Sequence, residues 1–258
     1  MLPNDMFHTD EPSPIVVARD ASYGAAGYRS FEFASFEVCP GDVVALVSVD
    51  TAASRDAVLA CAGLVHPTSG SLAVDGVELA RRARRSLRAP SLPRGFAGVG
   101  VFTGLFDVDV ALTVEQAVAR ECAYRGDRST DVLDYLSAFG LATHADRTLA
   151  VLDPAARARL SAALACAGGV RLATFDLNDP FLDGASLADI RETMGLLRAY
   201  CAERGACAVV ATGETDACDA FTRVYPLDID AAERLRRSRA PRPAHLKMAS
   251  TDEGEVDA

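Results

Sequence analysis

Apolar and polar positions follow two different periods along the chain, and the change of period predicts two kinds of element. Residues 15–21 and 30–42 alternate apolar and polar side chains and end in a Pro-Gly-Asp turn, a pattern typical of antiparallel strands. Residues 43–49 are almost entirely apolar, which predicts a strand buried on both faces. Residues 54–64 then place their apolar side chains at helical spacing. The first quarter of the chain is therefore expected to form strands followed by one helix.

The rest of the chain alternates helix, glycine and apolar strand. An Asp75-Gly76 pair predicts a hairpin. Helices are predicted at 113–125, 131–142, 156–169 and 190–205, and buried strands at 170–176 and 206–212. Alternating helices and buried strands predict an α/β fold with a mostly parallel core sheet that carries helices on both faces, preceded by a small antiparallel sheet.

Length and composition fit one large domain with flanking tails. The chain has 258 residues, half of them apolar, which is close to the upper limit for a single core. Residues 1–14 and 231–258 are rich in charge and proline, and both are predicted to be disordered tails. Residues 15–230 are then the folded domain, with a helical lobe at about 110–150.

Charge and rare residues exclude several classes of function. Acidic residues outnumber basic ones by 36 to 26, which argues against a general nucleic-acid binder. No apolar run approaches the ~20 residues of a membrane span, and the start lacks a secretory signal, so a cytoplasmic protein is expected. The seven cysteines form no Cys-x-x-Cys pair, which argues against a zinc site or a disulfide framework. The only lysine is Lys247, so a mechanism that needs a lysine in the core is excluded.

The order of these segments resembles that of an ATP-binding cassette, the nucleotide-binding subunit of ABC transporters. Residues 36–49 and 62–79 resemble the first half of the cassette, and 152–183 align without a gap on the stretch from the signature motif to the D-loop. The similarity covers roughly residues 15–230. It implies a P-loop NTPase-like fold, with an N-terminal antiparallel β subdomain and an inserted helical lobe.

The resemblance places the phosphate-binding loop, normally G-x-x-x-x-G-K-[ST], at 48–56. Its glycine positions hold Ser48, Thr51 and Ala53, and its lysine position holds Ser54. The next two positions hold Arg55 and Asp56. Such a cradle needs glycines that let backbone N–H groups converge, a lysine, and a hydroxyl for Mg²⁺. Asp50 and Asp56 would each repel a phosphate by ~4 kcal/mol at ~4 Å and an effective dielectric constant of ~20. Tight ATP binding is not expected. A shifted loop could aim Arg55 at phosphate, but a surface helix arginine is the preferred interpretation.

The other positions where the family carries catalytic residues are also altered, in ways that argue against ATP hydrolysis. Asp176 falls on the aspartate that positions Mg²⁺ through water, but Leu177 replaces the glutamate that activates the attacking water. Gly213 stands where the switch histidine is expected. The signature position contains Asp153 and Pro154, and proline lacks an N–H group to offer a phosphate. No catalytic residue and no metal site is therefore predicted.

The resemblance to the cassette implies that a few residues are vestigial nucleotide-binding positions. Tyr23 resembles the aromatic residue that stacks on adenine, although simple packing explains it equally well. The full set is Tyr23, Ser54, Arg55, Asp56, Asp176 and Asp183. A separate arginine-rich loop is predicted to be solvated rather than to meet acidic lipid or an acidic protein surface; it contains Arg81, Arg82, Arg84, Arg85, Arg88 and Arg94.

The leading hypothesis is a degenerate cassette subunit that associates with an ABC permease or a second cassette and does not hydrolyse ATP. It would bind no cofactor and no nucleic acid, and would meet the membrane only through its partner. An apolar patch on the lobe is expected. Two alternatives stay open. The first is an active ATPase that binds ATP and Mg²⁺ with Arg55, Asp176 and Asp179 in replacement roles, and the second is a binding module unrelated to transport.

Overall fold

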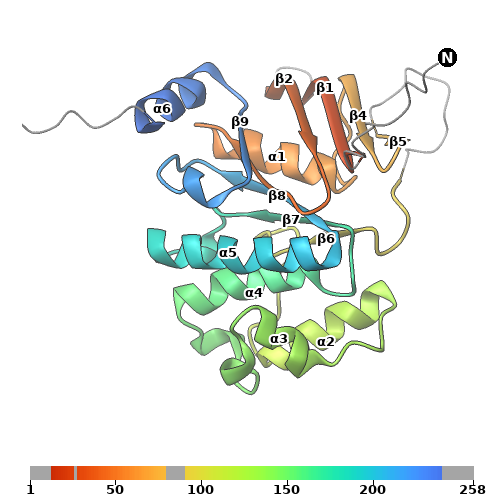
Figure 1. Ribbon diagram of the computed structural model, residues 1–258, viewed down its shortest axis with the longest axis vertical. Helices are drawn as coiled ribbons and strands as arrows, with labels where there is room; N and C mark the ends of the chain where they lie inside the picture. The colour runs from red at the N-terminus through yellow and green to blue at the C-terminus, as the bar shows by residue number, and fades with distance from the viewer. Residues whose placement is uncertain (1–12, 26–27, 80–90, 240–258) are drawn as a thin grey trace, which may run out of the picture.

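Two sheets of different kinds organise the protein (Figure 1). The computed structural model describes residues 13–25, 28–79 and 91–239. The antiparallel sheet has the order β2-β1-β4-β5 and contains β1 (Val16–Ala25), β2 (Tyr28–Val38), β4 (Ser69–Val74) and β5 (Val77–Glu78). The parallel sheet has the order β6-β7-β8-β3-β9 and contains β3 (Val43–Val47), β6 (Ala97–Val99), β7 (Leu172–Asp176), β8 (Cys207–Thr212) and β9 (Arg223–Pro226).

Helices cover both faces of the parallel sheet, as predicted. The helices are α1 (Thr51–Cys61), α2 (Val114–Arg125), α3 (Val132–Ala138), α4 (Pro154–Cys166), α5 (Leu187–Arg204) and α6 (Ile229–Arg239). Short 3₁₀ turns are η1 (Ala142–His144), η2 (Leu149–Val151), η3 (Pro180–Leu182) and η4 (Cys218–Ala220). α1 lies between the two sheets, α4 and α5 cover the opposite face, and α2 and α3 lie outside α4 (Figure 1). The α/β fold predicted from the sequence is confirmed.

The alternation of side chains along β3 explains why its sequence is apolar throughout. Val44 and Leu46 pack into the core shared with α1 and the antiparallel sheet. Val43, Ala45 and Val47 pack into the second core, which contains α4 and α5. Because both faces are covered, each position along this strand must be apolar.

Two predicted boundaries need correction. The helix expected at 54–64 begins at Thr51 and ends at Cys61, because Asp50 caps it earlier than the spacing of apolar residues indicated. The predicted disordered tail at 231–258 is wrong in its first part, because α6 extends to Arg239 with Ala231 and Leu235 buried one turn apart. Residues 1–12 and 240–258, the remainder of the predicted tails, lie outside the described residues.

Close approach between β6 and α4 makes a glycine necessary just after the strand. A Cβ at Gly100 would lie 2.7 Å from the Ser161 Oγ and 2.9 Å from the Phe175 Cβ. We therefore expect Gly100→Ala to lower the free energy of unfolding by about 2–3 kcal/mol, measured by urea denaturation. Gly195→Ala is the control, since a Cβ there would meet no atom within 4 Å. Gly195 is an exposed position inside α5, where alanine stabilises a helix relative to glycine by up to ~1 kcal/mol. Equal losses in both variants would contradict this account of the packing.

Candidate functional site

The carboxyl ends of three neighbouring parallel strands meet at one edge of the sheet. β3 leads into Ser48, β7 ends at Asp176 and β8 ends at Thr212. The Ser48 N–H donates to the Thr212 carbonyl at 3.2 Å, which ties two of these ends together. Ligands of open parallel sheets bind outside the carboxyl ends of the strands, so this edge is the candidate site.

The loop between β3 and α1 is much shorter than the predicted phosphate-binding loop at 48–56. Only three residues, at 48–50, separate the strand from the helix, and residues 51–56 belong to α1. Asp50 caps the helix by accepting a hydrogen bond from the Ala52 N–H at 3.0 Å. The chain's own carboxylate therefore lies at the helix N-terminus, where an anion would otherwise bind.

A second carboxylate reaches the same loop from the far end of the chain. Asp228 Oδ2 accepts hydrogen bonds from the Ser48 hydroxyl at 2.8 Å and from the Val49 N–H at 2.9 Å. Burial raises the pKa of Asp228, but hydrogen bonds from the Ala231 N–H, Ser48 and Val49 outweigh burial and lower the pKa overall. Two backbone N–H groups of this segment, those of Val49 and Ala52, thus donate to aspartate side chains of the protein itself.

The three predicted positions in α1 each have a partner inside the protein. Ser54 is fully buried and its hydroxyl donates to the Thr51 carbonyl. Asp56 accepts a hydrogen bond from the Ser30 hydroxyl of β2 at 2.7 Å. Arg55 lies on α1, is half-buried and donates to a backbone carbonyl in the loop after β6.

Arg55 holds the loop that follows β6. Its Nη2 donates to the Thr103 carbonyl at 2.9 Å, and its guanidinium carbon lies 5.4 Å from the centre of the Phe102 ring. Desolvation of the aliphatic stem and the cation–π contact both favour this position. This contact could not be predicted from local sequence patterns, because Arg55 and Thr103 are 48 residues apart.

Asp176 is a buried carboxylate at the end of β7, with a relative exposure of 2 %. Its Oδ1 accepts hydrogen bonds from the Asn178 N–H at 2.8 Å and the Asn178 side-chain amide at 2.9 Å. Burial raises the pKa of Asp176 to about 6, although these hydrogen bonds and the charge of Arg55 act in the opposite direction. Burying a carboxylate in such an environment costs free energy, which makes this strand end a candidate functional site.

Asn178 connects Asp176 to the position where the switch histidine was expected. Its Oδ1 accepts a hydrogen bond from the Gly213 N–H at 2.7 Å. A Cβ at Gly213 would lie 3.3 Å from this oxygen and 3.3 Å from the Thr51 Cγ2. A larger side chain at Gly213 would therefore have to displace Asn178 or α1.

Asp179, the candidate replacement base, is buried and accepts three hydrogen bonds. Its carboxylate receives the Thr103 N–H at 2.7 Å, the Thr103 hydroxyl at 2.6 Å and the Phe181 N–H at 2.9 Å. These contacts fix the turn that begins η3 and attach it to the loop after β6. Residues 178–180 thus form a turn, and Asp179 caps η3.

The signature and D-loop positions lie at the start of α4 and the end of η3. Asp153 caps α4 by accepting from the Ala156 N–H at 2.7 Å, and Pro154 is the first residue of the helix. Asp183 is exposed, and its backbone carbonyl accepts from the Arg157 guanidinium at 2.9 Å. As at α1, an aspartate of the chain lies at the helix end where the family presents N–H groups to phosphate.

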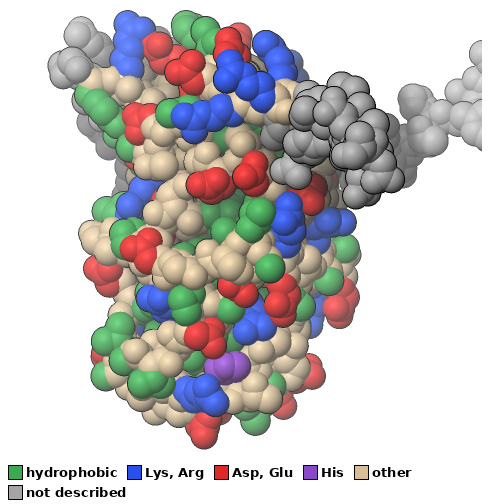
Figure 2. Space-filling model, turned by 90° about the vertical axis from the view of Figure 1, so that its left-hand side faces the viewer, with side chains coloured by type: hydrophobic (Ala, Val, Ile, Leu, Met, Phe, Trp, Pro, Cys, Tyr) green, Lys and Arg blue, Asp and Glu red, His purple; other side chains and the backbone are tan. Residues whose placement is uncertain are grey.

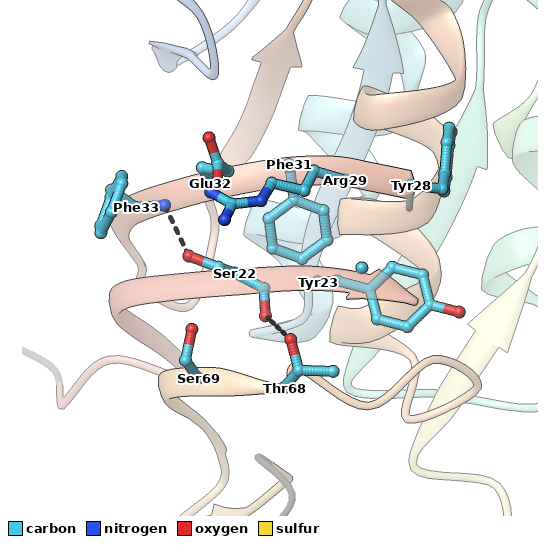
Figure 3. Close-up of a pocket in the computed structure, with 10 residues that line it drawn as sticks. Ser22, Tyr23, Tyr28, Arg29, Phe31, Glu32, Phe33, Thr68 and Ser69 are labelled. Atoms are coloured by element: carbon cyan, nitrogen blue, oxygen red, sulfur yellow. Dashed lines mark hydrogen bonds and ion pairs between the residues drawn. The ribbon is translucent and has the colours of Figure 1, made fainter. Parts of the chain in front are cut away.

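Tyr23 lies apart from these groups, in β1 of the antiparallel sheet. It lines a cavity of about 260 Å³ (Figure 3), and its ring centre lies 6.2 Å from that of Phe31. This distance is typical of a packed aromatic pair, and the side open to the cavity leaves room for a flat ligand. Both interpretations of Tyr23 therefore remain open.

A second cavity of about 370 Å³ lies beside the loop between β3 and α1. Its charged lining residues are Arg29, Glu32, Asp50, Asp228 and Asp230. Four acids and one arginine make this an electronegative cavity, which disfavours an anionic triphosphate.

No group of three potential metal ligands occurs among the described residues, and none of their helices is long and apolar enough to cross a membrane. The side shown in Figure 2 mixes acidic, basic and apolar side chains without a broad patch of one type. Of the predicted arginine-rich loop, Arg94 donates to the Tyr124 carbonyl at 2.6 Å, and the other five arginines lie outside the described residues.

Comparisons with known proteins bear on the fold. No protein-family model matches the chain. The ribose import ATP-binding protein RbsA 1 of Rhizobium etli is 29 % identical over 89 residues, which are 34 % of this chain and 17 % of that protein. The chain therefore matches only about a sixth of that relative's length.

Solved structures show the fold. The structure of cbiO1 from Clostridium perfringens, described as part of the ABC transporter complex cbiONQ, has a TM-score of 0.65 at 16 % identity and covers 83 % of this chain and 85 % of that one. A nucleotide-free ATP-binding cassette from an ABC transporter has a TM-score of 0.62 at 11 % identity and covers 83 % and 88 %. This chain has the fold of ATP-binding cassettes.

Proposed function

We propose that this chain, which has the fold of an ATP-binding cassette, is a cassette subunit of an ABC transporter that does not hydrolyse ATP. One observation carries the proposal: the N–H groups of Val49 and Ala52 are bonded to Asp228 and Asp50, in the place where a cassette would cradle phosphate. The chain would act as a docking or regulatory subunit, cytoplasmic and held at the membrane through its partner.

The lack of a free catalytic base and of a phosphate-binding cation supports the same proposal. Leu177 stands after the acidic strand and has no group that could accept a proton from water. Asp179, which could have replaced that base, already receives three hydrogen bonds in a buried position. Arg55, which could have replaced the lysine, donates to Thr103 instead.

Exposed apolar side chains at the edge of the lobe support a protein partner. Val110 and Val151 have relative exposures of 52 % and 67 %. The Ala150 N–H donates to the Val110 carbonyl at 3.1 Å, which places Val110 beside η2 of the lobe. This patch at the edge of the lobe is a surface that a permease segment or a second cassette would cover. The description of cbiO1 as part of a transporter complex is consistent with such a partner.

An ATP turnover assay with the purified full chain tests the proposal. We expect phosphate release no faster than in buffer, with Mg²⁺ and millimolar ATP, for both the wild type and Asp176→Ala. Turnover that depends on Mg²⁺ and is lost in Asp176→Ala would establish the alternative, an ATPase with replaced catalytic residues. The variant is informative because Asp176 is the one family metal position that the chain retains.

A further inference from the structure

The side chain of Asp228 joins α6 to the bend after β3. Its Oδ1 accepts a hydrogen bond from the Ala231 N–H at 2.6 Å, which caps the first turn of α6. Its Oδ2 accepts hydrogen bonds from the Ser48 hydroxyl at 2.8 Å and the Val49 N–H at 2.9 Å. The same carboxylate therefore caps a helix and occupies two donors of the bend. We call residues 228–239 the α6 strap.

Little apolar surface attaches the α6 strap to the rest of the protein. Ala231 and Leu235 are the buried side chains among those described in α6, whereas Ile229 is 80 % exposed. The helix lies at the margin of the molecule, beyond β9 (Figure 1). A helix that buries so little apolar surface opens at a lower free-energy cost than the elements of the core. The strap is therefore a part of the fold that can detach by itself.

The α6 strap also lines one side of the 370 Å³ cavity beside the bend. The charged lining residues are Arg29 and Glu32 of β2, Asp50 of the bend, and Asp228 and Asp230 of the strap. The strap thus supplies two of the four acids. Detaching it would leave two acids and one arginine around a wider opening, which makes the cavity less hostile to an anion.

The bend depends on the strap for its hydrogen bonds. Ser48 is only 1 % exposed, and its hydroxyl donates to Asp228. If the strap moves away, this buried hydroxyl and the Val49 N–H lose their acceptor, which is unfavourable. An anion that enters the cavity would restore both bonds, and hydrogen bonds to a charged acceptor are stronger than neutral ones.

We propose that the α6 strap is an autoinhibitory element. In place, it closes the bend after β3 with Asp228; released, it leaves a bend that binds an anion of the phosphate class. The inference deepens the proposed function and rests on it, because a partner that draws α6 away would change the state of the bend without any ATP hydrolysis.

Asp228→Asn in the full chain tests whether this carboxylate keeps the bend closed. Asparagine preserves the cap of α6 and removes the charge from the bend. In calorimetric titrations with inorganic pyrophosphate, the wild type should give a flat trace at millimolar concentration. The variant should give saturable heat, with binding at least tenfold tighter than in the wild type. The matched control is Asp131→Asn, which changes the cap of α3 in the lobe and should give a flat trace.

Leu235→Ser tests whether the attachment of α6 controls the bend. It removes a buried side chain of α6 and alters no residue that lines the cavity. Trypsin should cleave this variant faster than the wild type at the exposed Arg234, Arg236 and Arg237. Pyrophosphate should again bind at least tenfold more tightly than to the wild type. Leu133→Ser, at an exposed position in α3, is the control and should change neither result.

ATP as a second probe distinguishes the two sources of the phosphate group. Binding of ATP to Asp228→Asn tighter than that of pyrophosphate would identify a nucleotide, and equal or weaker binding would identify the free anion. The inference is overturned if Asp228→Asn binds no pyrophosphate, if α6 of Leu235→Ser stays as resistant to trypsin as the wild type, or if Leu235→Ser is cleaved faster yet binds no pyrophosphate. None of these outcomes bears on the proposed function, which fails only if the wild type turns over ATP.

Discussion

An Arg125→Ala variant is expected to lose about 3–5 kcal/mol of the free energy of unfolding, a large fraction of the stability of a typical domain. Arg125 is the last residue of α2, and its side chain is 9 % exposed. Its Nη1 donates to the carbonyls of Leu164 and Ala167 at 2.8 and 2.6 Å, at the C-terminal end of α4, and its Nη2 forms an ion pair with Glu121 at 2.7 Å. Truncation would leave these carbonyls and a partly buried carboxylate without their partner.

Chemical denaturation followed by circular dichroism measures this loss. Arg125→Lys should recover only part of it, since an ammonium cannot present the planar fork that reaches several carbonyls at once. Arg128→Ala, at an exposed position three residues further along, should change the stability by less than ~0.5 kcal/mol. If Arg125→Ala behaves like Arg128→Ala, the role assigned to this side chain in joining the lobe to α4 is wrong.

Asp176→Asn is expected to stabilise the protein at neutral pH by up to about 3 kcal/mol. The ordinary pKa of the group is 3.8, and burial raises the pKa to about 6 in the folded protein. The folded state therefore binds the proton more tightly than the unfolded state does. The stability that this group contributes is greatest below pH 4, falls as the pH rises through 6, and is constant above that. Asparagine avoids the cost of burying the charge and can still accept both hydrogen bonds from Asn178.

Urea denaturation of the wild type and Asp176→Asn between pH 4 and 8 measures this effect. The difference in unfolding free energy should be small near pH 4, grow between pH 4 and 6, and level off above pH 7. Asp134→Asn, a substitution of an exposed acid in α3, should show no such growth. A difference that is already complete at pH 4, or that has the opposite sign at pH 7, would rule out a raised pKa at Asp176.

The sequence predicted the fold well because burial on both faces leaves a strong signal. The uniformly apolar run from Val43 and the glycine that ends α5 are local features, and such features were sufficient to predict parallel strands and their helices. Helix starts were predicted less well. Asp50 is the N-cap of α1 and lies three residues after β3. The spacing of apolar residues does not show where a polar cap residue starts a helix.

The candidate site was only partly predictable, because its main contacts join distant parts of the chain. The hydrogen bond between Ser48 and Asp228 spans 180 residues, and Asp228 lies next to a segment that was interpreted as a charged tail. The pairing of Arg55 with Thr103 depends on how the loop after β6 folds back over α1. The motif positions showed where this sequence departs from the cassette pattern, whereas only the structure showed which groups lie at those positions.

The central claim is that the bend after β3 is occupied by the carboxylates of Asp50 and Asp228 and therefore accepts no phosphate. Calorimetric titration of the full chain with ATP, at millimolar concentration and with and without Mg²⁺, tests it most directly. The account predicts a flat trace in both titrations. Saturable heat that requires Mg²⁺ and reports one site per chain would contradict it.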